Sequence, residues 1–136
     1  MRGSCLCQTV IYEVSRLDSP IAHCSCDTCR KSHSAAFNTY AEVKHEHFKW
    51  VRGKELLASF ESSPGKKRYF CPQCGTQLIA QREREDHVIL RVGSLDDDPG
   101  VIPQFQIWAS HEVPWLSYGK HIVAYGEWEL TPLIRP

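Results

Sequence analysis

Apolar and polar residues alternate along several short segments of this chain, and turn-forming residues separate those segments. Val10, Tyr12 and Val14 take alternate positions in one segment, and Phe48 and Trp50 do so in another. Alternation with a period of two is typical of strands that bury one face. The pattern predicts strands at residues 9–14, 47–51, 56–60, 77–80, 87–92 and 105–109, and a further extended segment that ends at residues 69–70.

Turn signals lie between the expected strands. They are found at residues 62–65 (Ser-Ser-Pro-Gly), 96–100 (Asp-Asp-Asp-Pro-Gly) and 113–115 (Val-Pro-Trp). Only residues 29–37 have a composition that suits a short helix. Because no linker-like or repeated segment divides the chain, we expect one mainly β domain over residues 1–136, with a loose tail at residues 131–136.

Composition narrows the classes of function. The 16 basic and 16 acidic residues give a formal net charge of zero, which does not favour general binding to nucleic acid. No apolar run is long enough for a membrane span, and no apolar segment behind Met1 resembles a secretory signal. We therefore expect a cytoplasmic protein with no membrane partner. In that reducing compartment clustered cysteines are more often metal ligands than disulfides, and their odd number agrees with this.

The most informative feature is the distribution of the seven cysteines, which fall into three clusters. Thiolates one or two residues apart can converge on one metal ion, and zinc is the usual occupant of sulfur-rich tetrahedral sites. A closed four-thiolate site leaves three cysteines, and three protein ligands with one open position are typical of a catalytic zinc. We expect two zinc ions, one structural and one reactive, held by Cys5 and Cys7, by Cys24, Cys26 and Cys29, and by Cys71 and Cys74.

The structural site is expected at a Cys-x-x-Cys turn. Cys71 and Cys74 can present two thiolates from one tight turn, and Gly75 permits the positive φ that such a turn often needs. Cys5 and Cys7 are the natural partners, and the ion would then close a loop of more than sixty residues. The alternative is that Cys5 and Cys7 are small buried hydrophobic residues.

The reactive site is expected at Cys24, Cys26 and Cys29, which one loop can direct to a single ion. Zinc with three thiolates carries a net charge of −1, so it is less suited to generating hydroxide than to holding an external thiol as the thiolate. Two alternatives are open. His23 or His33 could close a second structural site, or Cys26 and Cys29 could join the Cys-x-x-Cys turn.

Five ordered segments carry a resemblance to a known family. They are residues 3–7 (GSCLC), 23–31 (HCSCDTCRK), 62–65 (SSPG), 68–76 (RYFCPQCGT) and 93–96 (GSLD). Together they resemble the glutathione-dependent formaldehyde-activating enzymes, whose domain also occurs in centromere protein V. The resemblance runs from residue 3 to about Trp115. It implies a β-tent of mainly antiparallel strands, a structural zinc on the first and third cysteine clusters, and a catalytic zinc on the second.

The resemblance also implies an activity. The family's founding reaction joins formaldehyde and glutathione into S-hydroxymethylglutathione, and the enzyme is classed as a carbon–sulfur lyase. Basic side chains would then hold the two glutathione carboxylates, because guanidinium and ammonium groups suit carboxylates. Gln106 stands where many members of the family have His. The candidates for binding glutathione are Arg30, Lys31, Lys66, Lys67 and Arg68.

Two other classes of function compete with a lyase. A non-catalytic, zinc-stabilised binding or scaffolding module would have two closed sites and would exchange no ligand. A nucleic-acid module would need the same basic residues to form one patch with exposed aromatic side chains, and the zero net charge argues against it.

Overall fold

The computed structural model describes residues 1–116, 125 and 127. Strands dominate, with one short α-helix and four single-turn 3₁₀ helices among the described residues. The helix is α1 (Asp27–His33), and the strands are β1 (Arg2–Ser4), β2 (Ile11–Val14), β3 (Ala22–Cys24), β4 (Asn38–Lys44), β5 (Phe48–Arg52), β6 (Ala58–Ser63), β7 (Lys66–Phe70), β8 (Gln77–Arg82), β9 (His87–Arg91) and β10 (Phe105–Ile107).

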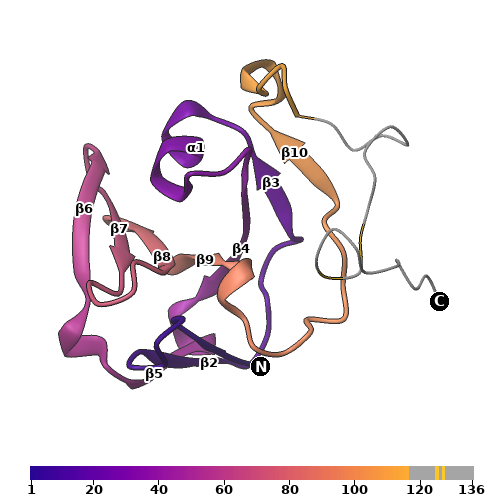
Figure 1. The fold of residues 1–136 in the computed structure, drawn as a ribbon. Helices are drawn as coiled ribbons and strands as arrows, with labels where there is room; N and C mark the ends of the chain where they lie inside the picture. The colour runs from indigo at the N-terminus through magenta and orange to yellow at the C-terminus, as the bar shows by residue number, and fades with distance from the viewer. Residues whose placement is uncertain (117–124, 126, 128–136) are drawn as a thin grey trace.

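The strands form two sheets. A three-stranded sheet has the order β1-β2-β5, and a seven-stranded sheet has the order β10-β3-β4-β9-β8-β7-β6. Neighbouring strands are antiparallel except for β10 and β3, which run parallel. In Figure 1, β2 and β5 lie at one end of the view, and α1 lies at the other end beside β3 and β10. The expected mainly β fold is confirmed, and the parallel pair makes the larger sheet mixed.

The hydrophobic core joins the two sheets. Val10, Tyr12 and Val14 are all at most 1% exposed, as the alternation of this segment predicts. The ring of Tyr12 stacks on Phe48 with centroids 5.3 Å apart, and its hydroxyl forms a 2.7 Å hydrogen bond with Ser94 Oγ. This hydrogen bond satisfies the one polar group of a fully buried tyrosine.

The two faces of the larger sheet have different characters at β4 and β9. Ala41 and Val43 of β4 pair with Leu90 and Val88 of β9, and all four side chains are buried. The residues between them point to the other face, because successive side chains of a strand alternate. This second face carries polar and charged residues that line a cavity: Asn38, Tyr40, Glu42, His87 and Arg91.

The sequence-based prediction was incomplete at the strands and the helix. It missed β1, β3 and β4, and it began the helix at Cys29, whereas α1 begins at Asp27. The Sγ atom of Cys26 accepts a 3.3 Å hydrogen bond from the Cys29 backbone N–H and so caps the helix. This cap explains why α1 begins two residues before the predicted start. The tail predicted at residues 131–136 lies outside the described residues. No helix in the described part is long and apolar enough to cross a membrane.

Gly3 provides a test of how tightly β1 packs on the core. A Cβ at Gly3 would overlap the ring of Tyr12, whereas a Cβ at the exposed Gly93 would meet no atom within 4 Å. Neither glycine has a positive φ, so the two differ mainly in available space. We expect Gly3→Ala to lower the free energy of unfolding by about 1–3 kcal/mol, the usual cost of overpacking. Gly93→Ala should change it by no more than about 0.5 kcal/mol in urea denaturation, as at other exposed sites. Equal effects would contradict the packing described here.

Candidate metal centre

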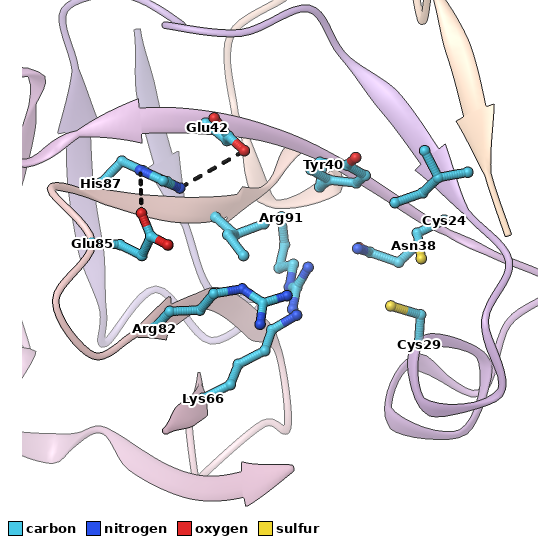
Figure 2. A pocket seen from close by; sticks show the side chains of 12 residues that line it. Cys24, Cys29, Asn38, Tyr40, Glu42, Lys66, Arg82, Glu85, His87 and Arg91 are labelled. Carbon is cyan, nitrogen blue, oxygen red and sulfur yellow. Dashed lines mark ion pairs between the residues drawn. The ribbon is translucent and has the colours of Figure 1, made fainter. Parts of the chain in front are cut away.

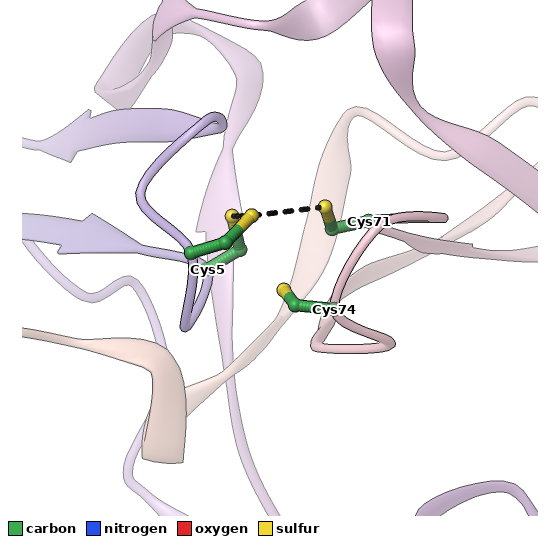
Figure 3. A group of neighbouring side chains, drawn as sticks. Cys5, Cys71 and Cys74 are labelled. Atoms are coloured by element: carbon green, nitrogen blue, oxygen red, sulfur yellow. Dashed lines mark hydrogen bonds between the residues drawn. The ribbon is translucent and has the colours of Figure 1, made fainter.

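Four cysteines from distant parts of the chain meet where the two sheets join. Cys5 and Cys7 lie in the loop after β1, and Cys71 and Cys74 lie in the turn between β7 and β8. Their four Sγ atoms lie within 4.8 Å of one another. Cys7 Sγ is 3.6 Å from Cys5 Sγ and 3.8 Å from Cys71 Sγ. Figure 3 shows Cys71 and Cys74 facing Cys5 across the space between the two segments.

The spacing of these sulfur atoms suits tetrahedral zinc. A Zn–S distance of about 2.3 Å and tetrahedral angles require sulfur atoms about 3.8 Å apart. The Cys71–Cys74 turn is held by its own backbone, since Gly75 N–H donates to Cys71 C=O at 2.8 Å. Gly75 adopts φ 79°, which a residue with a side chain rarely adopts. Four thiolates at this spacing could hold a metal ion.

The other three cysteines form a second group at the start of α1. The Sγ atoms of Cys24, Cys26 and Cys29 also lie within 4.8 Å of one another. Cys24 ends β3, Cys26 caps the helix, and Cys29 points inward from its first turn. Cys24 and Cys29 are buried, and Cys26 is partly exposed. The end of β3, the helix cap and the first turn of α1 therefore bring three thiols close together.

The group has three members among the described residues, and neither His23 nor His33 belongs to it. The Nδ1 atom of His23 forms a 2.9 Å hydrogen bond with the hydroxyl of Thr39. The Nε2 atom of His33 is buried without a hydrogen-bond partner in the described part of the chain. The arrangement thus leaves one side of the three-cysteine group without a fourth protein ligand among these residues.

The loop that carries Cys24 and Cys26 is braced from β10. Ser25, which is fully buried, donates its backbone N–H to Ile107 C=O at 3.2 Å. The side-chain amide of Gln106 donates to Ser25 Oγ at 2.8 Å and to a carboxylate oxygen of Glu112 at 2.7 Å. Gln106 therefore contacts the cysteine loop, and its side chain fixes Ser25 between two of the three thiols.

Arg68 lies against the same group. The residue is 3% exposed, and its Nη2 is 3.7 Å from Cys29 Sγ, while its Nε donates to Ser62 Oγ at 2.9 Å. Hydrogen bonding from Cys24 and, to a smaller extent, from Arg68 lowers the pKa of Cys29 to about 4, against the opposing effect of burial. The pKa of Cys24 moves upward because Cys24 shares that hydrogen bond and is itself buried. Of Cys24 and Cys29, Cys29 is thus the thiol more readily held as a thiolate.

Two cavities open on the three-cysteine group. The first, of about 400 Å³, is lined by Cys24 and Cys29 at one end and extends along the polar face of β4 and β9 (Figure 2). The second, of about 390 Å³, is lined by all three cysteines and by Arg68, Trp108 and His111, among others. Lys66 and Arg82 line both cavities. Cys24 and Cys29 therefore line both cavities, and Cys26 lines the second.

The five basic residues expected to bind glutathione take different positions. Lys66 and Arg68 lie beside the three-cysteine group. Arg30 forms an ion pair with Asp27 on the helix surface, and Lys31 lines a separate cavity. Lys67 is exposed and lines none of the cavities described here.

Sequence reasoning missed Asn38, Arg82 and Arg91. All three line the first cavity with the cysteines. A signal was present for Arg91, because a charged residue follows the apolar run Val88–Leu90 on the face opposite Val88 and Leu90. Asn38 and Arg82 gave no such signal, since polar residues at strand ends are common on protein surfaces.

A crystal structure of a Rhodobacter sphaeroides protein shares this architecture. The TM-score is 0.64 at 25% sequence identity, and the alignment covers 78% of this chain and 98% of that one. Curated proteins also match in sequence, among them the following two. A Podospora anserina protein that carries the name of the formaldehyde-activating enzymes is 31% identical over 84 residues, and an uncharacterized lyase of Schizosaccharomyces pombe is 29% identical over 76 residues.

The two sequence matches cover 60% and 56% of this chain, but only 39% and 53% of the respective relatives. The match to a family model is broader. It extends over residues 1–111, which include all seven cysteines, Arg68, Arg91 and Gln106. The resemblance seen in the ordered motifs is thereby confirmed, and the chain belongs to the glutathione-dependent formaldehyde-activating enzyme family.

Proposed function

We propose that this protein is a zinc-dependent carbon–sulfur lyase that acts on a thiol–aldehyde adduct, such as S-hydroxymethylglutathione. The observation that carries the proposal is the three-cysteine group, whose members line two cavities and which has no fourth protein ligand among the described residues. Membership of the family and the lyase name of one relative support the same class of reaction. Glutathione and formaldehyde are the proposed partners because the family is named for them.

The proposed roles of the cysteines follow from their surroundings. Cys5, Cys7, Cys71 and Cys74 would hold a structural zinc, since they join two sheets and already have near-tetrahedral spacing. Cys24, Cys26 and Cys29 would hold the catalytic zinc. When bound there, the ion would supply a positive charge that stabilises an external thiolate at neutral pH.

The surrounding side chains would organise the thiol and the aldehyde. Arg68 donates toward Cys29 and so holds that thiolate in place. In the forward direction the sulfur of glutathione forms a bond to the formaldehyde carbon, and the thiol proton ends on the former carbonyl oxygen. The reverse reaction breaks the same carbon–sulfur bond. Both directions keep atoms and electrons in balance and need no redox partner.

Of the five basic residues expected to bind glutathione, Lys66 and Arg68 retain that role in the proposal. Both line the cavity on the three cysteines, so a bound thiol would bring its charged groups near them. Arg30 is paired with Asp27, and Lys31 and Lys67 face elsewhere, so these three would contribute less.

The reaction is tested by exchange-spectroscopy NMR on zinc-loaded protein with glutathione and ¹³C-formaldehyde. We expect the wild type to speed the interconversion of free formaldehyde and its adduct, and Cys26→Ser to remove the acceleration, because one ligand of the proposed catalytic site is lost. Exchange at the uncatalysed rate with both proteins would reject glutathione–formaldehyde chemistry. That result would leave another thiol substrate or a non-catalytic zinc-stabilised module.

The two cysteine groups should respond differently to mutation. Cys71→Ser should unfold the protein, because a structural zinc contributes about 10–16 kcal/mol, comparable to the ~5–15 kcal/mol stability of a domain. Cys26→Ser should leave a folded protein that has lost one zinc. Circular dichroism and zinc content by mass spectrometry distinguish the outcomes, and equal unfolding of both variants would disprove the two roles.

A further inference from the structure

The cavity over β4 and β9 has a collection of cationic groups at its centre. Lys66 of β7, Arg82 of β8 and Arg91 of β9 line it together with Cys24 and Cys29. Figure 2 shows the ends of the three basic side chains converging beside the two cysteines. The strand register explains the convergence in part, because Lys66 and Arg82 are directly opposite each other on β7 and β8.

Two buried polar side chains in this wall lack partners. Arg91 is 4% exposed, and neither its Nε nor its Nη2 has a hydrogen-bond partner within the described part of the chain. Asn38 is also 4% exposed, and its Nδ2 is unpaired in the same part. In Figure 2 the amide of Asn38 points toward the centre of the cavity. Buried donors are normally paired, so the unpaired atoms of Arg91 and Asn38 require an acceptor that the described residues do not supply.

The carboxylates of the described residues do not fill this role. Among the described residues, none of Lys66, Arg82 and Arg91 forms an ion pair. Glu42 and Glu85, at the far end of the cavity, instead lie 3.7 and 3.9 Å from the ring nitrogens of His87. Burial, followed by the neighbouring cations, lowers the pKa of Lys66, which agrees with an excess of positive charge at this point.

We propose that Lys66, Arg82, Arg91 and Asn38 form a subsite that binds a carboxylate of the thiol substrate. The inference rests on the proposed function in that the thiol is placed at Cys24 and Cys29, which line the same cavity. A carboxylate is acceptor-only and offers about four lone-pair sites to these donors. A guanidinium can engage it through two parallel hydrogen bonds. A thiol with a neutral or cationic end gains none of these contacts.

The subsite therefore selects substrates by charge. The preferred class is a small thiol with a carboxylate a few bonds from its sulfur. The residues that set the preference come from β4, β7, β8 and β9, not from the helix that carries Cys26 and Cys29. Arg30 and Lys31, which the sequence indicated, lie on that helix and outside this cavity.

Three thiols of similar length test the proposal: 3-mercaptopropionate, 2-mercaptoethanol and cysteamine, which end in a carboxylate, a hydroxyl and an ammonium. Their affinities for zinc-loaded protein are measured by isothermal titration calorimetry. We expect 3-mercaptopropionate to bind at least about tenfold more tightly than the other two, the effect of one charged hydrogen bond or more. Equal affinities for the three thiols would overturn the proposal.

Single substitutions test which residues cause the preference for a thiol with a carboxylate. Lys66→Met and Arg82→Gln should each weaken binding of 3-mercaptopropionate about five- to tenfold, because each removes one cation that is partly or fully exposed. Neither should change the affinity for 2-mercaptoethanol, which has no carboxylate. Lys67→Met is the matched control, because it removes the same charge from the next position of β7 and lies outside the cavity. If Lys67→Met weakened binding of 3-mercaptopropionate as much as Lys66→Met, the proposed subsite would be wrong.

The experiment separates this inference from the proposed reaction. If the wild type prefers 3-mercaptopropionate but does not accelerate formaldehyde exchange with glutathione, the subsite stands and the lyase assignment fails. If exchange is accelerated but the thiols show no preference by charge, the lyase assignment stands and the subsite fails.

Discussion

The contact between the loop after β1 and the turn after β7 is the constraint on which the rest of the structure depends. Cys7 and Cys71 are 64 residues apart in sequence, and their sulfur atoms lie 3.8 Å apart at the junction of the two sheets. Cys5 and Cys71 also belong to the hydrophobic core. A metal ion on the four thiolates would restrict the unfolded chain as well as hold the folded one, because it closes a long loop. The position of β7, and with it Lys66 and Arg68, follows from this contact.

The three-cysteine group depends on a different set of contacts. Its helix is short, and it is held in place by the cap at Cys26 and by β10, through Ser25 and Gln106. A site of this kind can lose a ligand without loss of the core, since Val10, Tyr12 and the other core residues lie in a separate cluster. In this account the four-cysteine group stabilises the fold and the three-cysteine group carries the proposed chemistry. Both offer thiolates, but their surroundings differ.

Much of this could be predicted from the sequence, because cysteine spacing is a local signal. Residues two or three positions apart in a loop lie close together, so spacing favoured the grouping of Cys24, Cys26 and Cys29. The alternative, in which Cys26 and Cys29 join the Cys-x-x-Cys turn, could be set aside only from the fold. Strands with one apolar face, such as residues 10–14 and 87–91, were also visible from their alternation.

The missed strand β4 shows why the remainder was not predictable. Ala41 and Val43 face the core and Tyr40 and Glu42 face the cavity, so the segment does alternate, but its apolar side gives a weak signal because Ala41 is small and Thr39 is polar. The cavity-facing residues of this strand are themselves part of the site. Arg82 and Arg91 lie near Lys66 because β7, β8 and β9 are paired in one sheet. This pairing is long-range information that no local sequence pattern contains.

The central claim is that the three-cysteine group accepts an external thiol as its fourth ligand. Zinc K-edge absorption spectroscopy on the fully loaded protein tests it most directly, because Zn–S and Zn–O distances of about 2.3 and 2.0–2.2 Å are distinguishable. Without added thiol, one four-sulfur site and one three-sulfur site with a bound water should average about 3.5 sulfur ligands per zinc. Saturating glutathione should raise the average to about four. An unchanged count would contradict the claim.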